Sequence, residues 1–98
     1  MQYGTVAHMR VKKGMLEELR KMTEAEDMMD IPGYVATVVY QIDADPDELY
    51  MAVVFESKEA YTKNADSPEQ DARYRDFIKL LDGEPEWHDG TIIYNHSK

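Results

Sequence analysis

The chain has 98 residues, a length that fits one domain built around a single hydrophobic core. It carries 20 Asp and Glu against 11 Lys and Arg, and the resulting net charge of −9 disfavours nucleic acid and anionic lipid surfaces as partners. The sequence has no cysteine, which excludes disulfides, thiolate nucleophiles and Cys-ligated metal sites. No apolar run is long enough to span a membrane, so we expect a cytoplasmic protein without a membrane partner. From the net charge we expect no nucleic acid partner.

The first half of the chain predicts a strand, a helix and a hairpin. Residues 3–11 alternate between two faces, which is the periodicity of a strand. Apolar residues then recur at helical spacing over residues 15–29. Residues 34–42 and 49–55 are rich in β-branched, aromatic and other apolar side chains and flank a turn cluster at 43–47. We predict that these two segments form a β-hairpin.

Two helix starts are strongly encoded in the second half. Ser57 can cap one helix through its side-chain oxygen. After a short linker at residues 64–66, Ser67, Pro68 and Gln70 occupy the N-cap, N1 and N3 positions of a second helix, with capping-box chemistry.

The second of these helices is followed by a last strand. The helix carries an apolar stripe of Tyr74, Phe77, Ile78 and Leu81. Asp82 and Gly83 end it, and residues 87–94 form an apolar run. The resulting order β-α-β-β-α-β predicts one α+β domain over residues 1–98, a ferredoxin-like antiparallel sheet with its helices on one face. The other face then needs cover, so we expect two sheets to pair in a homodimer.

Several segments resemble the antibiotic biosynthesis monooxygenase family. The resemblance is carried by the order of elements, by the segments Ile31-Pro32-Gly33-Tyr34 and Phe55-Glu56-Ser57-Lys58-Glu59-Ala60-Tyr61, and by Ser67-Pro68. It covers nearly the whole chain and implies a dimeric α/β barrel. The members of that group include cofactor-independent oxygenases of quinols and anthrones, haem-degrading enzymes and small proteins of unsettled function.

The resemblance also directs attention to a pocket between the sheet and its helices. In haem-degrading relatives a Trp stands where this chain has Asn64, and the haem-ligating His falls about where Tyr74 stands. Those departures argue against haem degradation. In the quinol-oxygenase branch, Asn, Trp, Tyr and Arg side chains bind substrate, and this chain has all four types. The resemblance therefore implies an oxygenase that uses no metal, flavin or haem.

His8 is the candidate base, because an imidazole can accept a proton at neutral pH. The alternative is a surface histidine, or one satisfied by a neighbouring carbonyl. Asn64 can hold a hydroxyl or polarise a carbonyl, although an Asn here can also end the short helix in a left-handed conformation. Tyr74 lies on the apolar stripe, where its alternative role is a core aromatic, and the adjacent Arg73 points about 100° away and suits an ion pair.

The segment from Trp87 to Gly90 is the second dense group. A His beside an Asp is compatible with a base and its orienting partner, but adjacent residues of a strand face opposite sides, so His88 and Asp89 cannot readily cooperate. Asp89 with Gly90 can equally form a bulge or turn, and Trp87 can anchor a core or an interface. Two histidines without a third ligand do not predict a metal site.

We therefore predict a cofactor-independent monooxygenase acting on a small aromatic metabolite that is hydroquinone-like or polyketide-like. The alternative is a non-catalytic dimeric module of the same fold, which binds a ligand or acts in stress responses. The predicted catalytic residues are His8, Asn64 and Tyr74. The predicted substrate-binding residues are Phe55, Tyr61, Arg73, Trp87 and His88.

Overall fold

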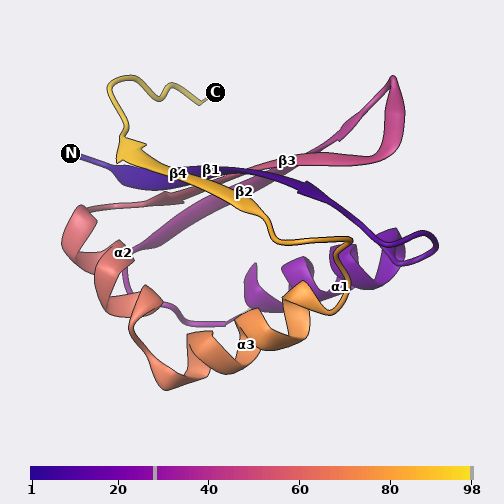
Figure 1. Ribbon diagram of the computed structural model, residues 1–98. Helices are drawn as coiled ribbons and strands as arrows, with labels where there is room; N and C mark the ends of the chain where they lie inside the picture. Colours follow the sequence, from indigo (N-terminus) through magenta and orange to yellow (C-terminus); the bar gives the residue numbers. More distant parts are fainter. Residues whose placement is uncertain (28, 98) are drawn as a thin grey trace.

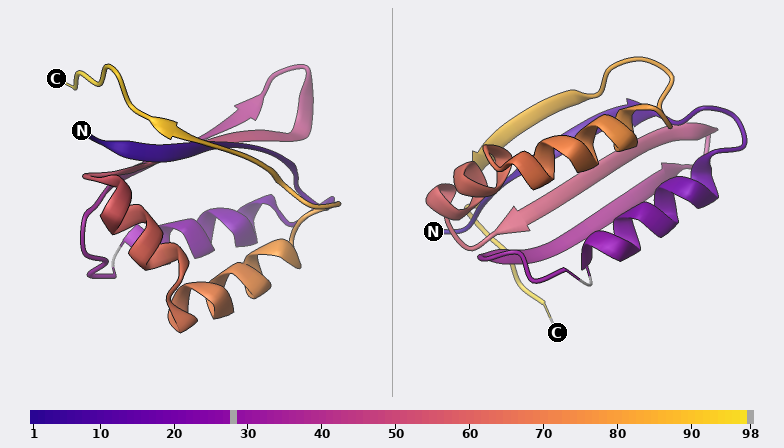
Figure 2. Two further views of the ribbon diagram at one scale, coloured as in Figure 1. Left: turned by 60° about the vertical axis from the view of Figure 1, so that its left-hand side comes forward. Right: turned by 90° about the horizontal axis from the view of Figure 1, so that it is seen from below.

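The computed structural model describes residues 1–27 and 29–97. Its elements, in chain order, are β1 (Tyr3–Arg10), α1 (Leu16–Asp27), β2 (Tyr34–Ile42), β3 (Asp45–Phe55), α2 (Lys58–Ala65), α3 (Pro68–Ile78) and β4 (Glu86–Thr91). The strands form one antiparallel sheet in the order β2-β3-β1-β4, and the helices lie over one of its faces (Figures 1 and 2). This confirms the predicted ferredoxin-like α+β fold.

The core lies between the helices and the face of the sheet that they cover, which we call the inner face. In the centre of the sheet, the inner face presents Ala7, Met9, Leu49 and Met51, each less than a tenth exposed. These side chains form one buried cluster with Val11, Leu19, Phe77 and Leu81. Full burial of a side chain such as Leu49 contributes about 1.5–3 kcal/mol, so the cluster is the main source of stability.

Both predicted helix caps are confirmed. Ser57 accepts a hydrogen bond from the backbone N–H of Ala60, and Ser67 accepts one from that of Gln70, each over 3.1 Å. The capping box of α3 is formed only in part, because the Gln70 side chain accepts hydrogen bonds from Arg73 instead of reaching back to the N-cap. The two caps fix where α2 and α3 begin.

The segment between α1 and β2 explains the Ile31-Pro32-Gly33-Tyr34 sequence. The helix ends at Asp27, and Met29 lies in a bend with 43% of its surface exposed, so it does not continue the apolar stripe; residue 28 lies outside the described residues. Gly33 has a φ of 80°, which favours glycine. Its carbonyl accepts a hydrogen bond from Glu56 N over 2.8 Å, which ties the start of β2 to the end of β3.

The predicted turn at residues 43–47 is too long. β3 already begins at Asp45, which pairs with Ile42, so only residues 43–44 form the turn. Asp45 accepts hydrogen bonds from Arg10 Nη1 over 2.7 Å and from the backbone of Asp47 over 3.1 Å. Both contacts, and most of all the one with Arg10, lower the pKa of the Asp45 carboxyl. They stabilise the ionised carboxylate at the start of β3.

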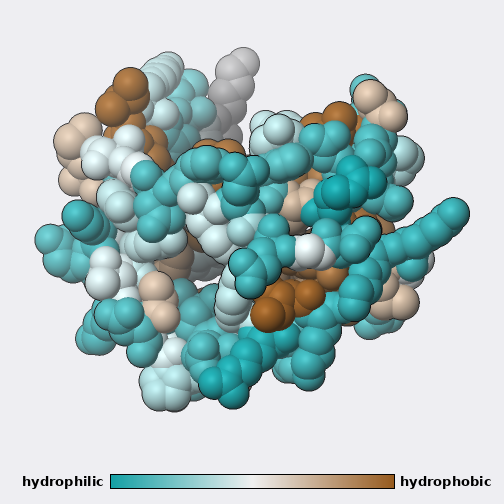
Figure 3. Space-filling view, viewed as in Figure 1, coloured by the Kyte–Doolittle hydropathy of each residue, from teal (hydrophilic) through white to brown (hydrophobic). Residues whose placement is uncertain are grey.

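The predicted last strand is also too long at its C-terminal end. β4 ends at Thr91, whose partner Tyr3 is the first residue of β1, so the ladder has no further strand to extend along. Ile93 and Tyr94, predicted to continue the strand, are 90% and 72% exposed. Figure 3 shows mainly hydrophilic surface on this side of the molecule, with hydrophobic side chains gathered where the C-terminal segment leaves β4.

The opposite face of the sheet, which we call the outer face, carries none of the named helices (Figure 1). It presents an apolar group of side chains beside charged and histidine side chains at the ends of the strands. Strand register places Val6, Val38, Tyr40 and Tyr50 on it, and these side chains are between 40% and 60% exposed. Within the described part of the chain, no helix is long and apolar enough to cross a lipid bilayer.

Candidate active site

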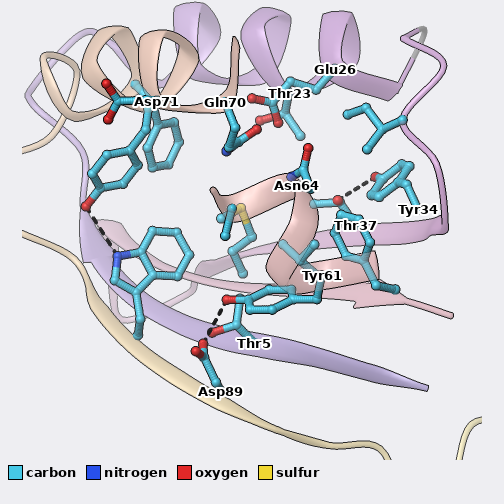
Figure 4. A pocket seen from close by; sticks show the side chains of 18 residues that line it. Thr5, Thr23, Glu26, Tyr34, Thr37, Tyr61, Asn64, Gln70, Asp71 and Asp89 are labelled. Atoms are coloured by element: carbon cyan, nitrogen blue, oxygen red, sulfur yellow. Dashed lines mark hydrogen bonds between the residues drawn. The ribbon is translucent and has the colours of Figure 1, made fainter. Parts of the chain in front are cut away.

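A pocket of about 410 Å³ lies between the inner face and the helices (Figure 4). Its volume falls in the range of sites that bind small molecules. The aromatic residues of its lining are Tyr34, Phe55, Tyr61, Tyr74, Phe77 and Trp87. Its uncharged polar residues other than tyrosine and tryptophan are Thr5, Thr23, Thr37, Asn64 and Gln70, and its acidic residues are Glu26, Asp71 and Asp89.

Aromatic rings make up much of the pocket wall. Phe55 stands edge-to-face with both Tyr34 and Tyr61, and each pair of ring centroids is 5.7 Å apart. The Tyr74 and Trp87 rings lie 6.0 Å apart, and Trp87 Nε1 donates a hydrogen bond of 3.4 Å to the Tyr74 hydroxyl. Rings held in place by one another can stack against a planar ligand at little entropic cost.

One end of the pocket holds three oxygen-bearing side chains, which come from β1, α2 and β4. The Tyr61 hydroxyl donates a hydrogen bond of 2.9 Å to Asp89 Oδ1, and the Thr5 side chain lies beside it (Figure 4). Burial, followed by the hydrogen bond to Asp89, raises the pKa of Tyr61 to about 12, while the nearby Thr5 hydroxyl acts in the opposite direction. Tyr61 is therefore neutral at physiological pH and serves as a donor.

The charge of the pocket is negative. Glu26, Asp71 and Asp89 line it, and none of its described lining residues is Lys, Arg or His. A carboxylate or phosphate ligand would meet like charge from Asp71 and Asp89, whereas Glu26 has Arg73 Nε at 3.9 Å outside the lining. The lining therefore favours a neutral ligand that donates hydrogen bonds.

Five residues predicted from the sequence come together in this pocket. They are Phe55, Tyr61, Asn64, Tyr74 and Trp87. Asn64 belongs to the last turn of α2, and every described residue other than glycine has a negative φ, so Asn64 is not the left-handed helix end considered as an alternative. The Tyr74 hydroxyl accepts its hydrogen bond from Trp87, which links α3 to β4.

His8 does not reach the pocket. It lies on the outer face, where its Nε2 is 2.8 Å from Glu48 Oε1 and its Nδ1 is 3.6 Å from Glu86 Oε2. Its ring stacks on that of Tyr50 at 4.6 Å. Because side chains alternate along β1, those of Thr5 and Ala7 point to the inner face and that of His8 points away. The structure thus gives no support to His8 as the base of this pocket.

Arg73 and His88 also lie outside the lining. Arg73 donates to Gln70 Oε1 over 2.9 and 3.2 Å, and its Nε is 3.9 Å from Glu26 Oε1. It therefore connects α3 with α1. His88 points to the outer face with Nε2 3.7 Å from Glu86 Oε1, opposite in direction to Asp89, as strand alternation predicts. In residues 1–27 and 29–97, no group of three or more His, Asp or Glu is placed to hold a metal ion.

Sequence reasoning missed Thr5 and the inward role of Asp89. Thr5 is a small polar residue on the same face of β1 as Ala7 and Met9, and it is only 5% exposed. Asp89 is its direct neighbour across the β1–β4 ladder. A polar residue on an otherwise apolar strand face is the signal that could have found Thr5, whereas the position of Asp89 needs the strand register.

The sheet, the helices on one side of it and the aromatic pocket between them define a small ferredoxin-like α+β protein with an internal pocket. The sequence profile described as "Antibiotic biosynthesis monooxygenase" matches residues 3–76, about three quarters of the chain. The protein therefore belongs to this family. Among curated proteins, none matches the chain in sequence.

Solved structures agree with this fold. A protein from Chloroflexus aurantiacus, provisionally assigned as an antibiotic biosynthesis monooxygenase, is 24% identical with a TM-score of 0.79 and coverage of 99% of this chain and 98% of that one. A conserved protein from Methanosarcina mazei is 20% identical, with a TM-score of 0.77 and coverage of 92% and 91%. SnoaB from Streptomyces nogalater, a cofactor-independent oxygenase, is 13% identical, with a TM-score of 0.81 and coverage of 99% and 98%. At these identities the likeness shows the fold alone.

Proposed function

We propose that this protein is a cofactor-independent monooxygenase of a small, neutral, hydroquinone-like or polyketide-like aromatic metabolite. The observation that carries the proposal is the pocket of about 410 Å³, lined by six aromatic residues and by none of the basic residues that an anionic substrate would need. Family membership supports a monooxygenase, and the fold shared with SnoaB supports one that needs no cofactor.

The reaction needs only the substrate and dioxygen. In the simplest case a ring methylene next to a phenolic system becomes a carbonyl. One oxygen atom enters the ring as that carbonyl, and the two methylene hydrogens leave with the second oxygen atom as water. The substrate supplies all four electrons for the reduction of dioxygen, so no external reductant enters. The protein has to orient the ring, accept a proton and exclude bulk water.

Asn64 and Tyr74 are the proposed catalytic contacts on the helical side of the pocket. The Asn64 amide can donate to an oxygen on which negative charge develops, and it can accept from a hydroxyl. Tyr74 receives its hydrogen bond from Trp87, which leaves its own hydroxyl proton available to a substrate oxygen. Phe55, Tyr61 and Trp87 supply ring contacts that hold the aromatic plane.

We further propose that the protein works as a homodimer joined through the outer face. The exposed apolar side chains of Val6, Val38, Tyr40 and Tyr50 form a surface that a second copy would remove from water. Sheet-to-sheet packing would turn two open sheets into a barrel with helices on its outside. Sedimentation at micromolar concentration tests this, and a mass of one chain would exclude it.

The experiment for the oxygenase is oxygen uptake by metal-stripped protein with a panel of hydroquinones and anthrones, against protein-free controls. We expect substrate-dependent uptake and a product that carries one labelled atom from ¹⁸O₂. Mass spectrometry of that product distinguishes insertion of oxygen from oxidation that only removes hydrogen, and the protein-free controls measure the part that is autoxidation. Saturable binding across the panel without uptake above the controls would contradict the oxygenase and favour the non-catalytic ligand-binding module.

A further inference from the structure

We propose that Thr5, Tyr61 and Asp89 form a subsite that binds a phenolic hydroxyl of the substrate, with Asp89 as the acceptor of its proton. The subsite lies at the end of the pocket where β1, α2 and β4 meet. For the aromatic class of the ligand this inference rests on the proposed function. Its geometry rests on the positions of these side chains alone.

The Thr5 hydroxyl lies at the pocket without a hydrogen-bond partner among the described residues. Thr5 is 95% buried, since only 5% of its surface is exposed. Its Oγ1 lies near enough to the Tyr61 hydroxyl to influence the pKa of that group, but it forms no hydrogen bond of normal geometry with any described residue. A buried hydroxyl without a partner is destabilising, because no hydrogen bond replaces the one it makes with water in the unfolded chain. Since Thr5 lines the pocket, a ligand oxygen there would supply the missing partner.

The carboxylate of Asp89 has one oxygen that accepts from Tyr61 and a second that receives no hydrogen bond from a described residue. Strand register places Asp89 directly across the ladder from Thr5 on the same face of the sheet. Its Oδ1 accepts from Tyr61 over 2.9 Å, and no described residue donates to Oδ2. An ionised carboxylate accepts hydrogen bonds and donates none. The group bound beside it must therefore carry a proton.

These two requirements select one type of ligand group. A phenolic or enolic hydroxyl donates to Asp89 Oδ2 and accepts from Thr5 Oγ1, and so satisfies both. A quinone carbonyl would place an acceptor against the carboxylate and leave it unsatisfied, and a methyl ether lacks the proton. While Asp89 is ionised, the subsite therefore distinguishes the reduced substrate from an oxidised, quinone-type product, and release of that product is favoured once Asp89 has given up the proton it accepts.

The same contact gives the proton a destination. A carboxylate is a weak base for a neutral phenol, but a phenol that has lost one electron is a strong acid. When the ring passes one electron to dioxygen, giving superoxide, the substrate O–H bond breaks and its proton goes to Asp89 Oδ2. Tyr61 remains protonated and holds Oδ1, so the carboxylate keeps its orientation throughout.

Binding measured by calorimetry tests the subsite without turnover. The probes are naphthol, its methyl ether and the matching naphthoquinone. We expect the unaltered protein to bind naphthol at least tenfold tighter than the other two. Asp89→Asn should reduce that preference to about threefold or less, because an amide can also donate. Asp76→Asn is the matched control, since Asp76 is exposed on α3 and contacts Lys79 outside the pocket.

A second variant covers the case in which Asp89→Asn fails to fold. Thr5→Val keeps the shape of the side chain and removes the hydroxyl, and it should weaken binding of naphthol severalfold, and of the ether as well, because either ligand oxygen can accept from Thr5 Oγ1. Equal affinity for naphthol and ether in the unaltered protein, a preference that survives Asp89→Asn, or naphthol affinity unchanged by Thr5→Val would overturn the subsite.

Turnover separates this inference from the proposed function. If naphthol is preferred but no substrate supports oxygen uptake, the oxygenase fails and the hydroxyl subsite stands. If uptake is observed and Asp89→Asn leaves kcat within twofold of the unaltered protein, Asp89 is not the proton acceptor, while the oxygenase stands. The expected result is a loss in kcat of at least tenfold for Asp89→Asn, with a deuterium solvent isotope effect that this variant changes.

Discussion

The two faces of the sheet carry alternate residues of the same strands and yet form different chemical environments. On the inner face Thr5 and Asp89 meet in a pocket beneath the helices. On the outer face, one residue earlier in β4, His88 lies with His8 and Glu86 on an exposed surface. A dense polar segment in a strand is therefore divided between two environments. The residues that can act together in a sheet are set by the pairing of its strands and not by adjacency in the sequence.

A charge placed on the outer face should have the largest effect on the molecule. Val38→Glu would place a carboxylate in the proposed interface, and burial of an unpaired charge there would cost several kcal/mol. We expect sedimentation equilibrium to show a monomer at micromolar concentration. Ala72→Glu on the exposed side of α3 is the control and should leave the dimer intact. A Val38→Glu protein that remains dimeric would place the interface elsewhere.

Matched alanine substitutions on the two faces should separate their contributions to turnover. Asn64→Ala should lower kcat/KM about 10- to 100-fold, because it removes a hydrogen bond to the reacting oxygen. His8→Ala should change kcat/KM by less than about twofold, since His8 contacts Glu48 and Tyr50 on the outer face. Kinetics with a proven substrate measures both variants, after sedimentation has shown equal assembly. A large loss for His8→Ala would restore it as a catalytic candidate.

The pKa of Tyr61 gives the inner face a spectroscopic signature at alkaline pH. The folded protein holds that pKa at about 12, above the ordinary value of 10.0, so the unfolded chain loses this proton first. The raised pKa of Tyr61 therefore adds to the free energy of unfolding below pH 10, and this stabilisation is lost as pH rises toward 12. Ultraviolet titration of tyrosinate should show a late transition that Tyr61→Phe removes. A titration curve with the same late transition in Tyr61→Phe would assign it to another of the seven tyrosines.

The smallest expected effect is on stability at Thr5. Because its hydroxyl is buried without a hydrogen-bond partner among the described residues, Thr5→Val should leave the free energy of unfolding unchanged or raise it by up to about 1 kcal/mol. Urea unfolding measures this. Thr37→Val is a useful comparison, because Thr37 shares a hydrogen bond with Tyr34 and the variant protein should be less stable. Marked destabilisation by Thr5→Val would show that its hydroxyl is satisfied in the free protein.

Much of the fold could be predicted because its signals are local. Ser57 and Ser67 accept from backbone N–H groups three residues ahead, as their positions indicate. The strand over Tyr34–Ile42 has the predicted bounds. The strand-end errors fall at Asp45 and after Thr91, where the end of a strand depends on how far its partner extends. The predicted end of α3 was also wrong, since the helix ends at Ile78 and Leu81 pairs with Val11 instead. Such ends are set across the ladder and have no signal of their own in the sequence.

The candidate site was predictable in its aromatic part. Phe55, Tyr61, Tyr74 and Trp87 were predicted as pocket residues, and all four line the pocket. Its polar part was harder to predict from the sequence, because a histidine is a candidate base on either face of a strand. His8 and Thr5 differ by three positions, and this odd spacing puts them on opposite faces.

The sequence by itself determined the order of elements, the helix starts and the supply of aromatic side chains, because capping and periodicity act over a few residues. Only the tertiary structure decided which face each strand residue occupies and which strands are neighbours. That pairing sets Asp89 opposite Thr5 and directs Tyr61 of α2 toward both. The physical reason is that a hydroxyl-binding site of this kind is made by three elements separated in the chain, and their meeting depends on the register of the whole sheet.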